Sequence, residues 1–450
     1  MTKVIIVPSN TDLNRGDQAL VWESLRLVQD VFGKENVDCL LMADLDSTDS
    51  YIQNNQTSRL GYKFIDTILK HPGRKFSHKE SDSKSYTKLT LIQWGGQAII
   101  DYIRIRPLMS TFPFIRKIGE LLLSAKEKST IEEFKQADAI FVKGGGFIHS
   151  YGSITDPYFI FYLTNTLRIA QAYGKKVIML PNSIGPLKNS IARSIAVNTL
   201  NRCTLVTVRE NISKEYLDKL GVKALLYPDL GFFLKPSERD MRAYLADKGI
   251  PLDRQKVVIT LRPYRFLGFI NPNELFDNYI VEISNLVNHL YSKGYHVTFL
   301  AHTLGPSSHE DDRIAIKEVI HNLPKKLRDK VTYIEDFNLN CKEVESIYSC
   351  FDYMIGTRFH SVIFSINVNV PSIAIAYGGN KGKGIMDYLG NSAYSIDMDK
   401  IYENSLVQLF DMLEKNTIDF REKLEKSREM INQKRDELIM SIRKELVLDN

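Results

Sequence analysis

Two apolar segments late in the chain are followed by side chains that can bind anions. FDYMIG leads into Arg358 and, two residues later, His360. PSIAIAY leads into a glycine-rich stretch that carries Lys381 and Lys383. Open parallel sheets hold their ligands at the carboxyl ends of the strands. Guanidinium groups suit carboxylate and phosphate, and histidine can change its charge near neutral pH. The pattern therefore predicts an anion site that includes an acid–base group.

The other predicted strands end in residues of the same kinds. Glycines let the backbone approach a ligand, and helix N-termini add partial positive charge. Together these residues are typical of a site for phosphate and a second acidic group. They are Asn14, Gly16, Asp17, Gly144, Gly145, Gly146, Asn182, Ser183, Arg209, Asp229, Arg262, His302 and Tyr377.

Several of these residues also have a purely structural interpretation. The glycines at 144–146 could form only a tight turn, and Asp17 could only cap a helix. Asp229 could be a turn residue, Arg209 could form a surface salt bridge, and His360 could be a hydrogen-bonded structural histidine. The type of residue alone does not separate these alternatives.

The acidic run His309–Asp312 resembles a metal cluster, but a solvated helix start is the favoured interpretation. The four cysteines form no CxxC pair and show no metal-ligand spacing, which suits a reducing compartment. A net charge of +5 is too small to indicate nucleic acid as a partner. The start MTKVIIVPSN is expected to be a first strand rather than a signal peptide, and no segment has the length of a membrane span. We therefore expect a cytoplasmic protein.

Two series of alternating strands and helices must position the site residues. The 450 residues suffice for two domains with buried cores. The first series covers about 1–240, with an irregular insertion at about 46–130. The second covers about 241–400, and a charged helical tail occupies 401–450. The sequence predicts two Rossmann-like α/β domains with parallel sheets, facing across a cleft that holds the ligand.

The order of the motifs resembles the polysaccharide pyruvyltransferase family over about residues 5–390. The motifs are NRGDQAL, VKGGGFI, SIGP, VTVRENIS, PDLGF, GTRFHSVIFSI and PSIAIAYGGNKGKGIMDYLG. The R-x-H strand end followed by P-x-I-x-I-x-Y is fairly specific, whereas the glycine-rich motifs alone are not. The resemblance implies a GT-B-like architecture and transfer of the enolpyruvyl unit of phosphoenolpyruvate to a sugar as a cyclic ketal. The sugar would belong to a capsular, exopolysaccharide or cell-wall precursor, often carried on a lipid.

By the same resemblance, Arg209 and Arg358 would bind the carboxylate and phosphate of the donor, and His360 would lie at the reacting centre. The reaction needs a positioned acid and base. Either Lys381 or Lys383 would neutralise the leaving phosphate.

The remaining acid–base role would fall to Asp17 or Asp229, which could deprotonate the sugar hydroxyl. No step needs a metal or another cofactor, because phosphoenolpyruvate is itself the donor substrate.

Part of the insertion, residues 102–128, interleaves apolar and basic residues. Its basic residues are Arg104, Arg106, Arg116, Lys117, Lys126 and Lys128, with only Glu120 and Glu127 in opposition. A helix with apolar and basic faces can lie in a membrane interface. The alternative is an insertion packed on the N-terminal domain with its basic side chains in water.

Two other functions remain open from the sequence. A GT-B glycosyltransferase would use the same basic residues to hold the diphosphate of a nucleotide sugar. A scaffold protein without activity could retain the fold, but it has no need of Arg209, Arg358 and His360 at strand ends.

Overall fold

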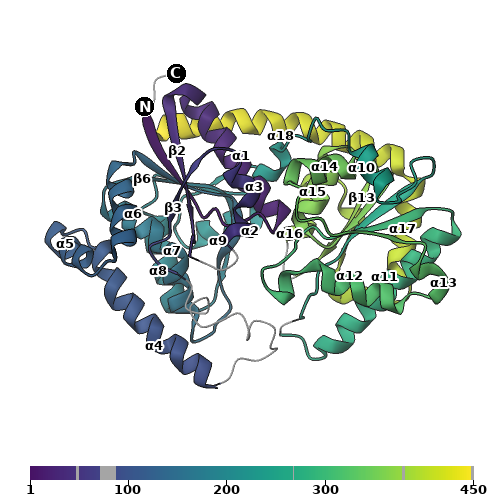
Figure 1. Ribbon diagram of the computed structural model, residues 1–450, viewed down its shortest axis with the longest axis horizontal. Helices are drawn as coiled ribbons and strands as arrows, with labels where there is room; N and C mark the ends of the chain where they lie inside the picture. The colour runs from purple at the N-terminus through teal and green to yellow at the C-terminus, as the bar shows by residue number, and fades with distance from the viewer. Residues whose placement is uncertain (47–49, 71–87, 267, 378–380, 447–450) are drawn as a thin grey trace. The chain divides into compact units, whose positions relative to one another are not determined.

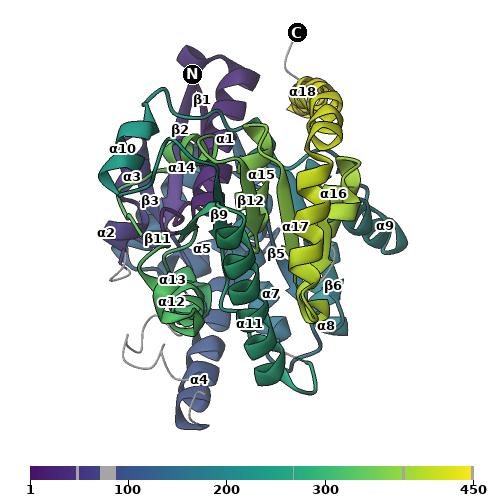
Figure 2. The same cartoon turned by 90° about the vertical axis from the view of Figure 1, so that its right-hand side faces the viewer.

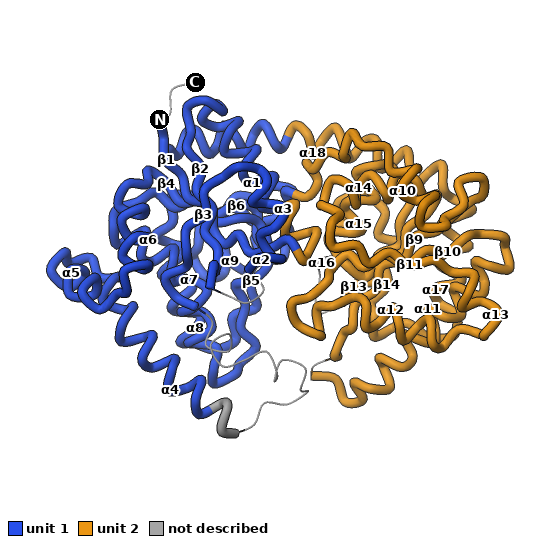
Figure 3. Tube along the Cα trace, in the orientation of Figure 1, with its two compact units in different colours: residues 1–12, 20–230, 434–450 blue, residues 13–19, 231–433 orange. Residues whose placement is uncertain are grey.

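A computed structural model describes residues 1–46, 50–70, 88–266, 268–377 and 381–446, without the side chains of 88–91 and 381–383. The chain forms two compact units (Figure 3). Unit 1 comprises Met1–Asp12, Leu20–Leu230 and Lys434–Asn450, and unit 2 comprises Leu13–Ala19 and Gly231–Gln433. The division falls before the boundary expected near residue 240, and the short segment 13–19 belongs to unit 2.

The sheet of unit 1 is parallel, with the strand order β3-β2-β1-β4-β6-β7-β8 and β5 paired to β6. Its central strands β1, β2, β4, β6 and β7 are apolar and mostly buried because helices pack around the sheet (Figure 1). They are β1 (Thr2–Val7), β2 (Val37–Ala43), β3 (Lys63–Asp66), β4 (Ala139–Val142), β5 (Gly145–Ser150), β6 (Lys176–Leu187), β7 (Leu205–Val208) and β8 (Leu225–Leu226).

The helices of unit 1 connect these strands in the crossovers that a parallel sheet requires. Helix α1 (Arg15–Phe32) follows β1, and its first turn belongs to unit 2. The others are α2 (Ser50–Gln53), α3 (Asn55–Ser58), α4 (Lys88–Ile105), α5 (Pro113–Leu121), α6 (Ala125–Gln136), α7 (Asp156–Ala172), α8 (Ser190–Leu200) and α9 (Asn211–Lys219).

The sheet of unit 2 is also parallel, with the order β11-β10-β9-β12-β13-β14. Its strands are β9 (Lys256–Thr260), β10 (His296–Leu300), β11 (Thr332–Ile334), β12 (Tyr353–Gly356), β13 (Ser372–Ala376) and β14 (Ser395–Asp397). The strand order reverses between β9 and β12, which lie side by side. Such a reversal is where an open α/β sheet binds its ligand.

Helices cover the sheet of unit 2, and Figure 2 shows α11, α12 and α17 in front of the strands. They are α10 (Met241–Asp247), α11 (Pro272–Ser292), α12 (Asp312–Asn322), α13 (Lys325–Arg328), α14 (Cys341–Tyr348), α15 (Phe359–Asn367), α16 (Lys381–Tyr388), α17 (Ser405–Lys415) and α18 (Thr417–Leu446).

The predicted fold class is confirmed, and the differences are local. The stretch expected to be irregular, 46–130, contains β3 and the helices α2 to α6 in its described parts. The glycines expected to form a loop after β4 instead begin β5. The stretch expected to be a lysine-bearing loop contains the start of α16 at Lys381.

The last helix, α18, ends in unit 1. Leu438, Ile442 and Leu446 recur every four residues and are buried, so they form one apolar stripe. Lys176 Nζ donates to the carbonyl oxygen of Leu446 at 2.8 Å, and Arg443 Nε donates to that of Val31 at 3.0 Å. The last turns of α18, up to Leu446, thus pack on unit 1.

Truncation of this stripe should destabilise unit 1. Ile442 is fully buried, so Ile442→Ala should lower the free energy of unfolding by about 2–5 kcal/mol. Met440, two residues earlier, is 57% exposed, and Met440→Ala should change it by less than about 0.5 kcal/mol. Urea unfolding of both variants measures the difference. Equal, small effects would show that the stripe does not pack on the core.

Candidate active site

Four neighbouring strands of unit 2 end in the residues that the sequence singled out. Gly356 of β12 pairs with Thr260 of β9, so the segments after these two strands start side by side. Arg262 follows β9, Arg358 and His360 follow β12, His302 follows β10 and Tyr377 follows β13. These side chains come from the point where the strand order reverses, which supports a ligand site there.

A buried ion pair fixes Arg358. Its Nε donates to Asp312 Oδ1 at 2.7 Å, and its Nη2 donates to the carbonyl oxygen of Glu310 at 2.7 Å. Asp312 also accepts from the backbone N–H of Thr303 at 2.8 Å. Arg358 is 6% exposed and Asp312 is fully buried. Burial raises the pKa of Asp312 to about 6, although Arg358 acts in the opposite direction. At neutral pH the carboxylate form therefore predominates, and the guanidinium is held in one orientation.

Asp312 corrects one prediction from the sequence. The run that contains it was expected to be a solvated helix start. Asp311 does cap α12 by accepting from the backbone N–H of Arg313 at 3.1 Å, but Asp312 points inward to Arg358. The described residues contain no cluster of three metal-ligating side chains. Four polar residues in a row gave no signal that one of them would be buried.

His360 is packed directly against the backbone of Gly16. A Cβ atom at Gly16 would lie 2.3 Å from His360 Nδ1 and 2.5 Å from its Cβ. Because the Cβ of His360 is itself too close, a rotation of the side chain could not relieve the clash. Gly16 is therefore required by a close approach, and it fixes the position of the imidazole within unit 2.

Asn14 and Asp17 shape the same short segment. Asn14 Oδ1 accepts from the backbone N–H of Gly16 at 3.1 Å, and its Nδ2 donates to Asp17 Oδ2 at 2.9 Å. Arg15 is buried, and its Nη2 donates to the carbonyl oxygen of Asp336 at 3.1 Å. These bonds hold the start of α1 in the conformation in which Gly16 meets His360. The acid–base role of Asp17 remains a prediction.

His302 is a buried neighbour of this group. Its Nδ1 lies 3.0 Å from Tyr348 Oη, and its Nε2 has no hydrogen-bond partner among the described residues. Burial, with further contributions from His360, Arg358 and Arg15, lowers the pKa of His302 well below its usual range. His302 is therefore neutral at physiological pH, so it adds no positive charge beside Arg358.

Aromatic rings line the ends of β9 and β13. The Arg262 guanidinium lies 4.5 Å from the centroid of the Tyr377 ring, a cation–π geometry. Tyr264 contacts the same ring, with centroids 5.1 Å apart. Tyr377, predicted as a site residue, thus orients Arg262 by contact with its ring. The side chains of Lys381 and Lys383, also predicted as site residues, lie outside the described residues.

The remaining predicted residues form a second group, in unit 1. Arg209 forms a buried ion pair with Asp229, and its Nε donates to Ser183 Oγ at 2.7 Å. The Arg209 side chain is only 5% exposed, so the alternative of a surface salt bridge is wrong.

The glycines and Asn182 lie next to this ion pair in the sheet. Gly145 pairs with Asn182, and Asn182 with Val208, the residue before Arg209. Asn182 Nδ2 donates to the carbonyl oxygens of Lys143 and Leu180 at 3.0 and 2.7 Å. A Cβ at Gly144 would lie 3.0 Å from the Pro181 carbonyl oxygen. Close approach of β6 thus explains Gly144, while Gly145 and Gly146 are strand residues and not a tight turn.

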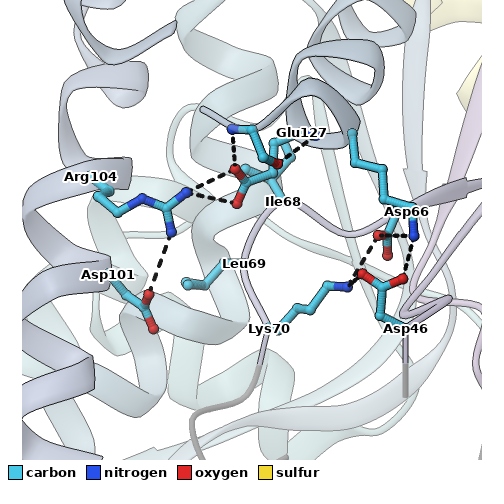
Figure 4. Close-up of a pocket in the computed structure, with 10 residues that line it drawn as sticks. Asp46, Asp66, Ile68, Leu69, Lys70, Asp101, Arg104 and Glu127 are labelled. Carbon is cyan, nitrogen blue, oxygen red and sulfur yellow. Dashed lines mark hydrogen bonds and ion pairs between the residues drawn. The ribbon is translucent and has the colours of Figure 1, made fainter. Parts of the chain in front are cut away.

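A pocket elsewhere in unit 1 is lined by charges that neutralise one another (Figure 4). Lys70 and Lys126 form ion pairs with Asp46 and Asp66, and Arg104 pairs with Glu127 at 2.8 Å. Every basic side chain that lines this pocket is engaged in this way. These ion pairs fasten α4 and α6 to the end of β3. No basic group that lines the pocket remains available for an anionic substrate.

The fold is shared with GT-B proteins. The crystal structure of Anabaena Alr3699/HepE in complex with UDP and glucose matches with a TM-score of 0.55 and 11% identity over 99% of both chains. Arabidopsis thaliana UGT89C1 complexed with quercetin matches with a TM-score of 0.52 and 11% identity over 98% of both chains. These likenesses establish a GT-B-like fold of two α/β domains with parallel sheets.

Comparison of the sequence identifies the family. The model of the polysaccharide pyruvyl transferase family matches residues 14–379, and the chain belongs to this family. The amylovoran biosynthesis protein AmsJ of Erwinia amylovora is 26% identical over 291 residues, which cover 61% of this chain and 65% of AmsJ. The chain thus matches just under two thirds of that relative's length.

The contact between Gly16 and His360 predicts how the protein responds to a methyl group added at position 16. Gly16→Ala should displace the His360 ring and lower the free energy of unfolding by about 1–3 kcal/mol, the usual effect of overpacking. Gly95→Ala, in α4 with nothing within 4 Å of the added Cβ, is the matched control. NMR spectra with labelled histidine rings and urea unfolding measure both effects. An unshifted His360 resonance in Gly16→Ala would contradict the contact.

Proposed function

We propose that the protein transfers the enolpyruvyl unit of phosphoenolpyruvate to a sugar of a polysaccharide precursor, forming a cyclic pyruvate ketal and releasing phosphate. Family membership supports the reaction class. The observation that carries the proposal is the arrangement of Arg358 and His360 at the strand reversal of unit 2, where Asp312 orients the first and Gly16 fixes the second.

Anion binding at this site would use fixed donors. The ion pair with Asp312 leaves Nη1 of Arg358 outside its hydrogen bonds to Asp312 and Glu310. Arg358 is the N-cap of α15, so the first backbone N–H groups of a nine-residue helix follow it directly. Arg262, held over Tyr377, adds a second guanidinium. These groups suit a ligand with a carboxylate and a phosphate.

The reaction requires one proton to be delivered and two to be removed. A proton is added to the methylene carbon of phosphoenolpyruvate, which leaves a cation at C2 stabilised by the neighbouring oxygen. One sugar hydroxyl adds to C2 and loses its proton, and phosphate leaves with the electrons of the C2–O bond. A second hydroxyl then adds and loses its proton, which closes the ring. His360, held in place against Gly16, is the group we assign to at least one of these transfers, because histidine is the side chain that most often acts as a general acid or base.

Other residues retain their predicted roles as proposals. Arg209 would bind an anionic group in unit 1, and Lys381 or Lys383 would neutralise the leaving phosphate. Asp17 or Asp229 would take a hydroxyl proton. We propose a lipid-linked glycan as acceptor, in capsule or exopolysaccharide synthesis in the cytoplasm, with no metal or other cofactor.

The alternative is a glycosyltransferase that uses a nucleotide sugar, because the fold is the same. Thermal stabilisation of the purified chain separates the two. Phosphoenolpyruvate should raise the melting temperature, whereas UDP- and GDP-sugars should not. Incubation with phosphoenolpyruvate and a panel of glycosyl lipids should then release phosphate and add the mass of a pyruvate ketal to one of them. Stabilisation by a nucleotide sugar alone would overturn the proposal.

His360→Ala should retain the fold and lower the turnover number by about two to four powers of ten, the usual contribution of one acid–base group. His321→Ala, an exposed histidine of α12, is the control and should retain full turnover. Phosphate release under saturating donor measures turnover, and the melting temperature reports the fold. A His360→Ala variant that fails to fold would assign His360 a structural role instead.

Arg358→Lys should also inactivate the protein, although the charge is kept. A lysine ammonium cannot reproduce the planar guanidinium that binds Asp312, the Glu310 carbonyl and an anion together. A hydrogen bond between charged groups contributes about 1.5–3 kcal/mol of binding free energy. Because about 1.4 kcal/mol corresponds to a factor of ten, the loss of one such bond should lower kcat/KM for phosphoenolpyruvate at least tenfold. Arg313→Lys, at a partly exposed pair with Asp311, should have little effect. Wild-type kinetics in Arg358→Lys would remove Arg358 from the site.

A further inference from the structure

Helix α4 has its apolar and polar faces reversed relative to an ordinary surface helix. Ile92, Ile99 and Ile103 share one face, and they are 70%, 64% and 61% exposed. The opposite face carries Asp101, which is buried and accepts hydrogen bonds from Gln97 Nε2 at 2.8 Å and Tyr158 Oη at 3.3 Å. The polar side of the helix therefore packs on the protein, and the apolar side faces solvent.

Helix α5 repeats this arrangement. Phe114, Ile118 and Leu121 lie on one face and are 76%, 44% and 73% exposed. On the other side, Gly119 packs against Leu108, and a Cβ there would lie 3.0 Å from the side chain of Leu108. Figure 1 shows α4 and α5 at the outer margin of unit 1. We call the six exposed residues Ile92, Ile99, Ile103, Phe114, Ile118 and Leu121 the outer apolar face.

Within residues 88–128, the acidic side chains lie on the inner sides of the helices, and several basic side chains lie in solvent. All three acidic side chains of residues 88–128 are bonded to the protein: Asp101 as above, Glu127 to Arg104 at 2.8 Å, and Glu120 to Tyr173 Oη at 2.6 Å. These bonds hold the inner sides of α4, α5 and α6, and Figure 4 shows the ion pair of Glu127 with Arg104. Glu127 and Glu120 form ion pairs with Arg104 and Lys135, and Asp101 is buried, which weakens their repulsion of an anionic surface.

Basic side chains remain in solvent beside the outer apolar face. Arg106, Lys117 and Lys128 are exposed and have no hydrogen bond or ion pair within the part of the chain that the structure describes. Arg104 and Arg116, which the sequence grouped with them, are engaged with Glu127 and with the Ser110 and Thr111 carbonyl oxygens. The available charge around the face is thus positive only.

We propose that the outer apolar face inserts into the interfacial layer of a membrane that contains anionic lipid, with Arg106, Lys117 and Lys128 at the headgroups. Apolar burial and attraction to anionic lipid are the two contributions that hold a helix in such an interface. None of the described helices is long and apolar enough to span a membrane, so the contact is peripheral. A second copy of the chain is disfavoured, because a symmetric contact through this face would bring the same unpaired cations together.

Flotation of the full chain with vesicles tests the proposal without use of its catalytic activity. We expect the protein to float with vesicles of phosphatidylcholine and phosphatidylglycerol, and the bound fraction to fall as salt is added. Phosphatidylcholine vesicles alone should bind it more weakly. Absence of flotation with the anionic vesicles overturns the proposal.

Two pairs of variants separate the apolar and charged contributions. Ile99→Glu with Phe114→Glu should abolish binding, whereas Ile418→Glu with Tyr402→Glu, at exposed apolar positions of unit 2, should not. Arg106→Glu, Lys117→Glu and Lys128→Glu together should lower the partition coefficient by at least about a hundredfold, from roughly 1 kcal/mol for each charge. Arg193→Glu, Lys219→Glu and Lys223→Glu change the net charge equally elsewhere on unit 1 and should have a much smaller effect.

Equal losses in the matched and control variants would show non-specific attraction and overturn the assignment of this face. Sedimentation tests the competing occupant. If the wild-type chain forms dimers that Ile99→Glu with Phe114→Glu disperses, and neither protein floats with vesicles, the face is a contact between two copies.

Discussion

The buried pair of Arg358 and Asp312 is the constraint on which the candidate site of unit 2 depends. Taking two opposite charges out of water is unfavourable unless their hydrogen-bonding groups are satisfied. Here the Thr303 N–H and the Glu310 carbonyl oxygen supply the additional bonds. The pair therefore joins the end of β12, the start of α12 and the segment after β10 in one arrangement.

Backbone proximity is the second constraint. The position of the His360 ring is limited by the space that Gly16 leaves. The short segment 13–19 belongs to unit 2 and is held there by the hydrogen bond from Arg15 to the Asp336 carbonyl oxygen and by the pairing of Asn14 with Thr303. A residue near the beginning of the sequence thereby limits the position of a side chain more than three hundred residues away. The motif NRGDQAL is explained by this packing as well as by chemistry.

The sequence predicted the parallel sheets and the strand-end residues because both follow from local patterns. Buried parallel strands are apolar runs, and their carboxyl ends are read directly from where each run stops. The partners of these residues were not predictable in the same way. Asp312 lies in a polar run that looks solvated, and Asp229 lies far from Arg209 in the sequence. Local composition reports neither contact, because each is set by the order of strands in the sheet. The regular helices within 46–130 were missed because polar stretches interrupt the expected alternation.

The direction in which an amphipathic helix faces is a further property that periodicity cannot supply. The isoleucines of α4 would predict a core-facing stripe in any soluble protein. In this chain Asp101 and Glu120 instead accept hydrogen bonds from Tyr158 and Tyr173 on the body of unit 1, and these bonds fix which side of α4 and α5 turns inward. Hydrogen bonds on the inner side offset part of the solvation free energy that each carboxylate loses on burial. The exposed isoleucine and phenylalanine side chains, in contrast, remain unfavourably hydrated. That residual unfavourable hydration is removed only when an apolar surface covers the helices.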